Sequence, residues 1–268
     1  MAFRFASLGR GSSGNGLVVE RGGTRILMDC GFTLGETSLR LGRLGLAPAD
    51  IAAIVVTHEH TDHLGGVARF STRHAIPVHL TRGTALALPV DFPASLVRFV
   101  DPHASFEVND LLVDPFPVPH DAREPVQYAF SDGASRLAVT TDLGMSTPHV
   151  EEKLSHCHAL VLECNHDAAL LQGGSYPRML KERISGRFGH LDNEAAAGIV
   201  SRIDCTRLEH IVAAHLSKEN NRPELAVRAL AGALGCEASW IGVAGQEDGF
   251  AWRSISSPGY FSVSDTDK

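Results

Sequence analysis

The stretch Thr57-His58-Glu59-His60-Thr61-Asp62-His63 places three histidines and one aspartate within six consecutive positions. It follows the apolar run 51–56, which predicts a buried strand, and it precedes residues 64–70, which could open a helix. Four residues of the types that bind metals therefore stand where a buried strand ends and the chain turns. The alternative interpretation is a polar surface loop that happens to be rich in histidine.

The spacing of these four residues predicts their geometry. His58 and His60 are two positions apart, so on extended backbone their side chains leave the same face. Asp62 and His63 follow after the chain has changed direction, and they can face a second point in space. This arrangement suits two neighbouring metal ions. Imidazole and carboxylate ligands fit Zn²⁺, with Mn²⁺ and iron as alternatives.

Length and composition set limits on the protein class. The 268 residues, of which 44% are hydrophobic and 21% charged, suffice for one large α/β domain over residues 1–268, or for two small ones. The sequence contains neither a linker nor a repeat, which favours one domain. The net charge of −7 argues mildly against a broad nucleic-acid surface, although two divalent ions, each adding two charges, would bring it to about −3.

The sequence also predicts where the protein works. The chain lacks an apolar run of ~18 residues, and its first residues lack the pattern of a signal peptide. The five cysteines form no C-x-x-C pair, which is typical of reduced thiols. We therefore expect a cytoplasmic protein without a membrane segment. Its oligomeric state stays open.

Several other polar residues also follow predicted strands. The strands expected before them are residues 24–28, 106–118, 136–141, 159–163 and 210–214, and the residues that follow are Asp29, His120, Asp142, His166 and His215. Loops at strand ends, held by a rigid sheet, commonly carry function in α/β proteins. We therefore expect these side chains to converge with those of residues 58–63.

The remaining segments read as connecting structure. The Gly/Ser-rich residues 9–16 indicate a turn of a hairpin and not a phosphate-binding loop, since the required lysine and following helix are absent. The expected helices cover residues 36–46, 149–155, 194–202 and 223–234. A strand over 240–244 is expected to end the fold, before a polar, loose tail from Ser254.

The motif H-x-H-x-D-H at residues 58–63 resembles the signature of the metallo-β-lactamase superfamily. The resemblance implies an α/β fold, a four-layer αβ/βα sandwich, with a two-metal hydrolytic site between its sheets. It assigns the first metal to His58, His60 and His120, the second to Asp62, His63 and His215, and a bridging position to Asp142. It also gives Asp29 a supporting role behind the metal-site loops, whereas an ordinary turn aspartate is the alternative.

Further segments resemble the YycJ/WalJ group of this superfamily. They are Ser7-Leu8-Gly9 with 11–15, Pro119-His120-Asp121-Ala122, Glu163-Cys164-Asn165-His166-Asp167, and Gly189-His190-Leu191 with 215–221. His60 in place of Glu, and Asp142 in place of Cys, argue against oxygen-reducing relatives and true β-lactamases. The group is described as single-domain exonucleases that degrade DNA from 5′ to 3′. One departure is Asp192, where serine would be usual, and either residue can cap a helix.

The resemblance therefore implies a phosphodiesterase with two metal ions that share a water molecule. Its substrate is nucleic acid, and the resemblance favours DNA over RNA. Two ions about 3.5–4 Å apart would activate that water and hold the phosphodiester oxygens. Asp62 counts among the catalytic residues of this scheme. We expect His190, and also His166, to contact the scissile phosphate, one of them as general acid. Second-shell support is the alternative for either.

Other residues are candidates for contact with the substrate. Lys218 and Asn220 are candidates for positioning the phosphate, and the basic residues of 178–187 could guide a nucleic-acid backbone. Three other functions stay open at this point. They are an RNA-processing phosphodiesterase, a glyoxalase-type thioesterase and a metal-binding regulator without turnover.

Overall fold

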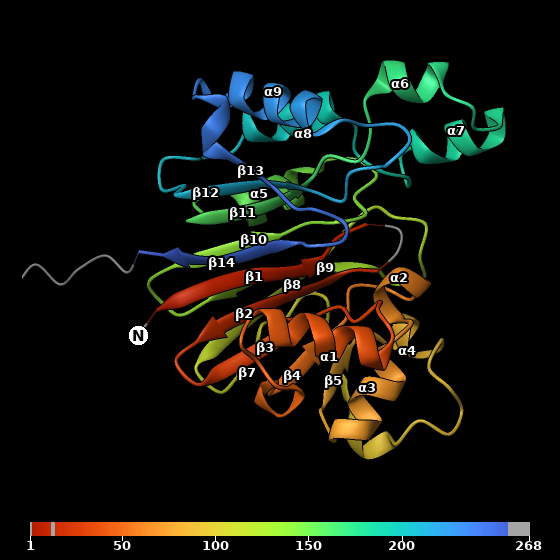
Figure 1. Cartoon of the computed structure of the whole chain (residues 1–268), viewed down its shortest axis with the longest axis vertical. Coiled ribbons are helices and arrows are strands. Elements are labelled where there is room, and N and C mark those ends of the chain that lie inside the picture. The colour runs from red at the N-terminus through yellow and green to blue at the C-terminus, as the bar shows by residue number, and fades with distance from the viewer. Residues whose placement is uncertain (1, 12–13, 257–268) are drawn as a thin grey trace, which may run out of the picture.

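A computed structural model describes residues 2–11 and 14–256, which form two mixed sheets of seven strands each (Figure 1). The first sheet contains β1 (Phe3–Gly9), β2 (Gly16–Arg21), β3 (Thr24–Met28), β4 (Ala53–Val55), β5 (Val78–Leu80), β6 (Val97–Phe99) and β14 (Phe250–Ile255). The second contains β7 (Phe106–Val108), β8 (Leu111–Pro117), β9 (Val126–Ser131), β10 (Arg136–Val139), β11 (Ala159–Glu163), β12 (His210–Ala214) and β13 (Ile241–Val243).

Helices cover the outer faces of the sheets and also form the connections at the strand ends. They are α1 (Leu34–Arg43), α2 (Thr61–Leu64), α3 (Val67–His74), α4 (Arg82–Ala85), α5 (Pro148–Leu154), α6 (Ala168–Gly173), α7 (Arg178–Ile184), α8 (Asn193–Val200) and α9 (Pro223–Leu234). None of these described helices has the length and apolar character needed to cross a bilayer.

Alternation along the strands builds three apolar layers, because successive side chains of a strand point to opposite faces. Between the sheets the layer includes Phe5, Val19, Val55, Phe130 and Val161. On the outer face of the first sheet, it includes Val18, Leu27 and Ile54, packed with Leu41 of α1 and Phe70 of α3. On the outer face of the second, it includes Leu160 and Leu162, packed with Val150, Ile199 and Leu230 of α5, α8 and α9. The predicted four-layer αβ/βα sandwich is thereby confirmed.

Each sheet has an antiparallel half and a parallel half. In the first, β14, β1, β2 and β3 pair antiparallel, and β3 to β6 pair parallel. In the second, β7 to β10 pair antiparallel, and β10 to β13 pair parallel. Parallel strands end at the same edge of a sheet. The residues that follow β3 and β4 therefore lie at one edge of the first sheet, and those that follow β10, β11 and β12 lie at one edge of the second.

Most predicted elements are present, with shifted boundaries. The hairpin over residues 9–16 joins β1 to β2. The helix predicted over 36–46 begins at Leu34 and ends at Arg43, where the backbone N–H of Leu44 bonds back to Leu41. Asp192 caps α8 through its side chain, which accepts a hydrogen bond from the Ala195 N–H. The helix over 223–234 has the predicted bounds.

One prediction about the end of the chain is wrong. The fold does not end with the strand near 240–244, because β14 follows and pairs antiparallel with β1, Phe3 opposite Ile255. Ser254 and Ile255 therefore belong to a strand, and the rest of the predicted loose tail, from residue 257, lies outside the described residues. β14 was missed because it is an edge strand with a short, interrupted alternation, and its pairing with β1 is remote in sequence.

Two helices stand away from the sandwich. In Figure 1, α6 and α7 project beyond the sheets on the same side of the molecule as α2, whose residues belong to the histidine-rich stretch.

Replacement of Phe130 by alanine should remove about 3–5 kcal/mol from the free energy of unfolding, because Phe130 is fully buried between the sheets. Urea denaturation measures this loss. The matched control is Phe99→Ala on β6, whose side chain is 55% exposed and should change stability little. Equal losses for the two variants would contradict the proposed inner layer.

Candidate metal centre

The strand ends gather histidines and carboxylates into overlapping groups. In each group the ligand atoms lie within 4.8 Å of one another, and the groups are His58/His60/His120, Asp62/His63/His215, His58/His63/Asp142 and Asp142/Glu163/His190/His215. The first sheet supplies residues 58–63 after β4. The second supplies His120 after β8, Asp142 after β10, Glu163 at the end of β11 and His215 after β12, whereas His190 lies between α7 and α8. All seven residues predicted as metal ligands therefore lie together at one edge of the sandwich.

The first group contains a buried nitrogen that needs a partner. His120 Nδ1 is 3.1 Å from the Gly189 carbonyl oxygen, which leaves its Nε2 on the side of His60. His58 is fully buried and its Nδ1 lies 3.0 Å from Thr57 Oγ1. Its Nε2 has no hydrogen-bond partner among the described residues. A buried unpaired nitrogen is costly, whereas a bound cation would satisfy it, so the donor set fits a divalent metal.

Asp29 fixes the second group from behind. Its Oδ2 is 2.8 Å from His63 Nδ1, and its Oδ1 accepts hydrogen bonds from the N–H and hydroxyl of Thr57. His63 Nε2 then lies 2.8 Å from Asp142 Oδ2. A carboxylate on one ring nitrogen orients the other toward a metal, and this contact is the one that the supporting role predicted for Asp29 requires.

Glu163 was missed by sequence reasoning as an individual residue. Its side chain is fully buried at the end of β11, and Oε1 is 2.8 Å from His190 Nδ1 and 2.9 Å from His215 Nδ1. Oε2 accepts a hydrogen bond from the Leu143 N–H at 2.7 Å, next to Asp142. The signal available in the sequence was a carboxylate at the end of an otherwise apolar strand, where burial requires partners.

Asn15 was also missed as an individual residue, because the Gly/Ser-rich loop was interpreted as a turn and residues 11–15 entered only as a segment of the family resemblance. Its backbone N–H donates to the Asp62 carbonyl at 2.7 Å, and Nδ2 lies 3.1 Å from Asp62 Oδ2. Asn15 thus holds the backbone and carboxylate of Asp62 at once. Gly31 permits this approach, since a Cβ there would stand 1.8 Å from the Asp62 carbonyl oxygen.

Three site residues adopt left-handed backbone at the ends of their strands. The φ angles are +61° for Asp29, +51° for Asp142 and +58° for His215. Non-glycine residues seldom adopt this region, and such conformations are concentrated at functional sites where the surrounding contacts impose them. The abrupt turn after each strand aims the side chain into the gap between the sheets.

Buried charge sets the protonation of the site. Burial opposes the charged form of His215, but Asp142, Asp62 and Glu163 outweigh it and raise its pKa to about 10. The pKa of His63 is raised for the same reason by Asp29 and Asp142, against the effect of burial. Burial lowers the pKa of His58, and neighbouring histidines lower it further. In the metal-free protein the carboxylates therefore hold protons on some of the imidazoles.

A hollow of about 460 Å³ opens beside these groups. Its lining comprises His60, Asp62, Asp142, Asn165, Tyr176, Arg183, Ile184, His190, His215 and residues 216–219, which include Lys218. His190 and Lys218, two of the residues predicted to contact the substrate, therefore line this hollow.

Two predicted substrate contacts, His166 and Asn220, are not among the lining residues. His166 is buried and bridges to Asp192, and Glu163 and His190 are among the charged groups near it, so it lies close to the site but outside the lining of the hollow. Asn220 is buried, and its carbonyl accepts a hydrogen bond from the Asp167 N–H at 2.8 Å. Asn220 therefore braces the start of α6.

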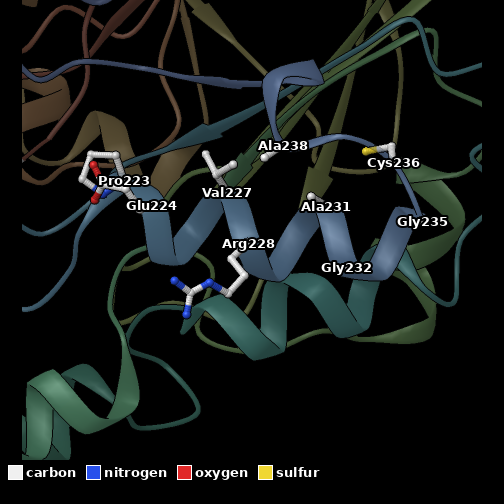
Figure 2. Close-up of a pocket in the computed structure, with 9 residues that line it drawn as sticks. All are labelled: Pro223, Glu224, Val227, Arg228, Ala231, Gly232, Gly235, Cys236 and Ala238. Atoms are coloured by element: carbon white, nitrogen blue, oxygen red, sulfur yellow. The ribbon is translucent and has the colours of Figure 1, made fainter.

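A second hollow, of about 750 Å³, lies along α9 (Figure 2). Its lining is mostly small or apolar, with Val227, Ala231 and Gly232 facing it, and its charged residues are Glu224 and Arg228. None of the metal-ligand candidates lines it, so it has no part in the metal chemistry of the strand ends.

The sequence matches the family described as "Beta-lactamase superfamily domain" over residues 24–215. The chain belongs to the metallo-β-lactamase superfamily. It is 34% identical to Exodeoxyribonuclease YycJ of Bacillus anthracis, over 84% of this chain and 87% of that protein. It is 32% identical to Exodeoxyribonuclease WalJ of Streptococcus pneumoniae serotype 2, over 84% of this chain and 86% of that protein.

These similarities place the chain in the YycJ/WalJ group of metallo-β-lactamase-fold hydrolases, as the motifs predicted. The crystal structure of YhfI from Bacillus subtilis, a metallo-β-lactamase fold protein, superposes with a TM-score of 0.71 and covers 95% of this chain and 100% of that one. At 14% identity, that likeness shows the fold alone. Together with the His/Asp groups, membership of the superfamily makes this edge a divalent-metal site.

Metal binding to this protein should strengthen as pH rises from 6 toward 10. Protons on His63 and His215 compete with the metal, and the pKa of His215 is raised to about 10, so binding must release protons. Titration calorimetry in two buffers of different ionisation enthalpy measures the number released. An affinity that is the same at pH 6 and pH 9, without proton release, would contradict this account.

Replacement of Glu163 by glutamine should weaken metal binding about 10–100-fold, because the ligand candidate His215 loses the carboxylate that orients its ring. The affinity can be measured by competition with a chromophoric chelator. The control is Glu151→Gln on α5, whose carboxylate pairs with Arg202 on the surface. Wild-type affinity in Glu163→Gln would show that Glu163 does not orient the ligands.

Proposed function

We propose that this hydrolase is a single-domain deoxyribonuclease that requires two divalent ions, zinc or manganese, and removes nucleotides from the 5′ end of DNA. The main observation behind this proposal is that His190 and members of the metal-ligand groups line one cavity. Two relatives that align with more than four-fifths of the chain bear the name exodeoxyribonuclease, which supports the choice of substrate.

The chain itself would hold the metals through seven residues. We assign His58, His60 and His120 to one ion, Asp62, His63 and His215 to the other, and Asp142 to both. Two bound divalent ions supply a water of lowered pKa and neutralise charge on the phosphate. The rigid strand ends fix the positions of these ligands before any substrate arrives.

His190 has the surroundings of a general acid. It lines the cavity, and its Nδ1 is held by Glu163, so its Nε2 is the nitrogen free to serve the substrate. Burial lowers its pKa, but Glu163 and Asp142 outweigh burial and raise it above the ordinary value. A protonated imidazole can donate to the leaving 3′ oxygen of the departing nucleotide, which is the proton that phosphodiester cleavage requires.

Cations at the cavity rim can orient the phosphate. Lys218 lines the cavity with its side chain 54% exposed, near Glu247 at 3.6 Å. Arg183 also lines the cavity, and its Nε donates to Asp121 Oδ2 at 2.7 Å. Asp121 directly follows His120, so Arg183 connects the rim to the metal-ligand groups.

Replacement of His190 by alanine should lower turnover about 10²–10⁴-fold while both metals stay bound, because only the proton donor is lost. The assay is hydrolysis of end-labelled single-stranded and double-stranded DNA, with RNA and thioesters as competing substrates. His103→Ala, on an exposed loop, is the matched control. Loss of metal from His190→Ala would show that His190 is a ligand instead.

Stepwise loss of nucleotides from a labelled 5′ end supports the proposal. Hydrolysis confined to RNA or thioesters, or metal binding without any turnover, would overturn it in favour of the corresponding alternative.

A further inference from the structure

Residues 168–188, which we name the α6–α7 arm, are attached at both ends to the rim of the cavity. At the first end, the Asp167 N–H donates to the Asn220 carbonyl at 2.8 Å. At the second, the Asp121 N–H donates to the Phe188 carbonyl at 3.0 Å, one residue after the ligand candidate His120. Between these attachments the arm stands away from the two sheets (Figure 1).

The arm exposes large apolar and aromatic side chains. Phe188 is 61% exposed and Met179 is 82% exposed. Tyr176 lines the cavity itself, as Lys218 does. The backbone of Phe188 is held next to the ligand candidate His120, because its carbonyl accepts the hydrogen bond of Asp121, and its ring is exposed. Scattered apolar residues on a surface are ordinary, but two aromatic rings along one approach to a catalytic cavity call for an explanation.

The arm also carries positive charge in an acidic protein. It contains Arg178, Lys181, Arg183 and Arg187 against Glu182, a net of +3, whereas the whole chain has −7. Its contacts leave the cations accessible. Arg178 pairs with Glu182 at 2.7 Å with its side chain 91% exposed, and Arg183 pairs with Asp121 at 2.7 Å with its side chain 62% exposed.

The other two cations have uncharged partners. Lys181 Nζ donates to the Gln172 carbonyl at 2.7 Å, and Arg187 Nε lies 3.3 Å from Met145 Sδ. Exposed pairs and contacts of these kinds contribute little stability, so a phosphate can replace them at small cost.

We infer that the α6–α7 arm binds single-stranded DNA and leads its end into the cavity, an inference that rests on the proposed function. Aromatic rings that stack on bases, beside cations that follow the phosphates, are the features by which proteins bind single strands without sequence preference. In this arrangement, Tyr176 stacks on the base inside the cavity and Phe188 on a base outside it. Arg178 and Arg187 contact the phosphates between and beyond them.

Stacking on side chains favours a single strand over a duplex. A base must leave its stack and its partner to reach an aromatic ring, and this costs least in a strand that is already single.

The test is equilibrium binding of a 3′-fluorescein-labelled oligothymidylate to the metal-loaded full chain by fluorescence anisotropy. Phosphorothioate linkages slow its hydrolysis. Phe188→Ala should weaken binding about 5–150-fold, the equivalent of one lost stacking contact. The double variant Arg178→Gln/Arg187→Gln should reduce the slope of log affinity against log salt by about 1.4, since each phosphate contact contributes about 0.7 in a single strand.

Matched controls remove the same groups elsewhere. Phe99→Ala deletes a ring that is 55% exposed on β6, and Arg69→Gln/Arg73→Gln deletes two exposed arginines of α3. Neither should change affinity or salt slope. Thermal unfolding of each variant checks that these surface changes leave the fold intact.

The outcomes separate this inference from the proposed function. If the arm variants bind the single strand as the controls do, while the wild-type chain degrades DNA, the arm inference is wrong and the nuclease stands. If Phe188→Ala weakens duplex binding as much as single-strand binding, the preference for single strands is wrong. If the wild-type chain hydrolyses no nucleic acid and does not bind the oligonucleotide, both the function and the inference fall.

Discussion

The whole site depends on carboxylates that are buried at strand ends and bonded to imidazoles. Asp29, Asp142 and Glu163 are each at most 3% exposed. A buried carboxylate is stable only when charge and hydrogen bonds compensate for its lost hydration. Here the compensation comes from His63, His190 and His215, with divalent ions in the assembled site.

A further positive charge lies behind this cluster. Arg10 is 1% exposed, and burial lowers the pKa of its guanidinium to about 10, against the opposing influence of Asp29 and Asp142. The guanidinium keeps its charge at neutral pH. Its positive charge therefore offsets part of the repulsion between the buried carboxylates of Asp29 and Asp142.

The fold supplies rigidity at the place where these ligands are assembled. Strands with apolar side chains on both faces fix the backbone of each sheet, and the strand ends of the two sheets meet at one edge. The left-handed turns at Asp29, Asp142 and His215 then direct side chains from both sheets toward a common space. The first sheet offers four of the seven ligand candidates and the second offers three, so the site lies between the two sheets.

Much of this could be predicted from the sequence because the ligands repeat one local pattern. A histidine or aspartate directly after an apolar strand is visible without a structure, and His58, His120, Asp142 and His215 all follow it. Glu163 and Asn15 could not be found in this way, since their role depends on contacts across 27 to 52 residues. His166 and Asn220 carried the right chemistry, but whether a side chain faces the cavity depends on the path of the backbone.

The arm illustrates a second limit of the sequence. Its basic residues were visible as a cluster, but a solvated helix face would look the same. Only the placement of Tyr176 in the cavity lining, and the bond of the Phe188 carbonyl to Asp121, connect that charge to the site.

The metal content of the full chain tests the central claim most directly. Inductively coupled plasma mass spectrometry, after loading with zinc or manganese and removal of excess ion, should give two divalent ions per chain. This is the number that two sets of three ligands with a shared Asp142 require. A content of one ion or fewer at saturation would contradict the two-metal centre and the account built on it.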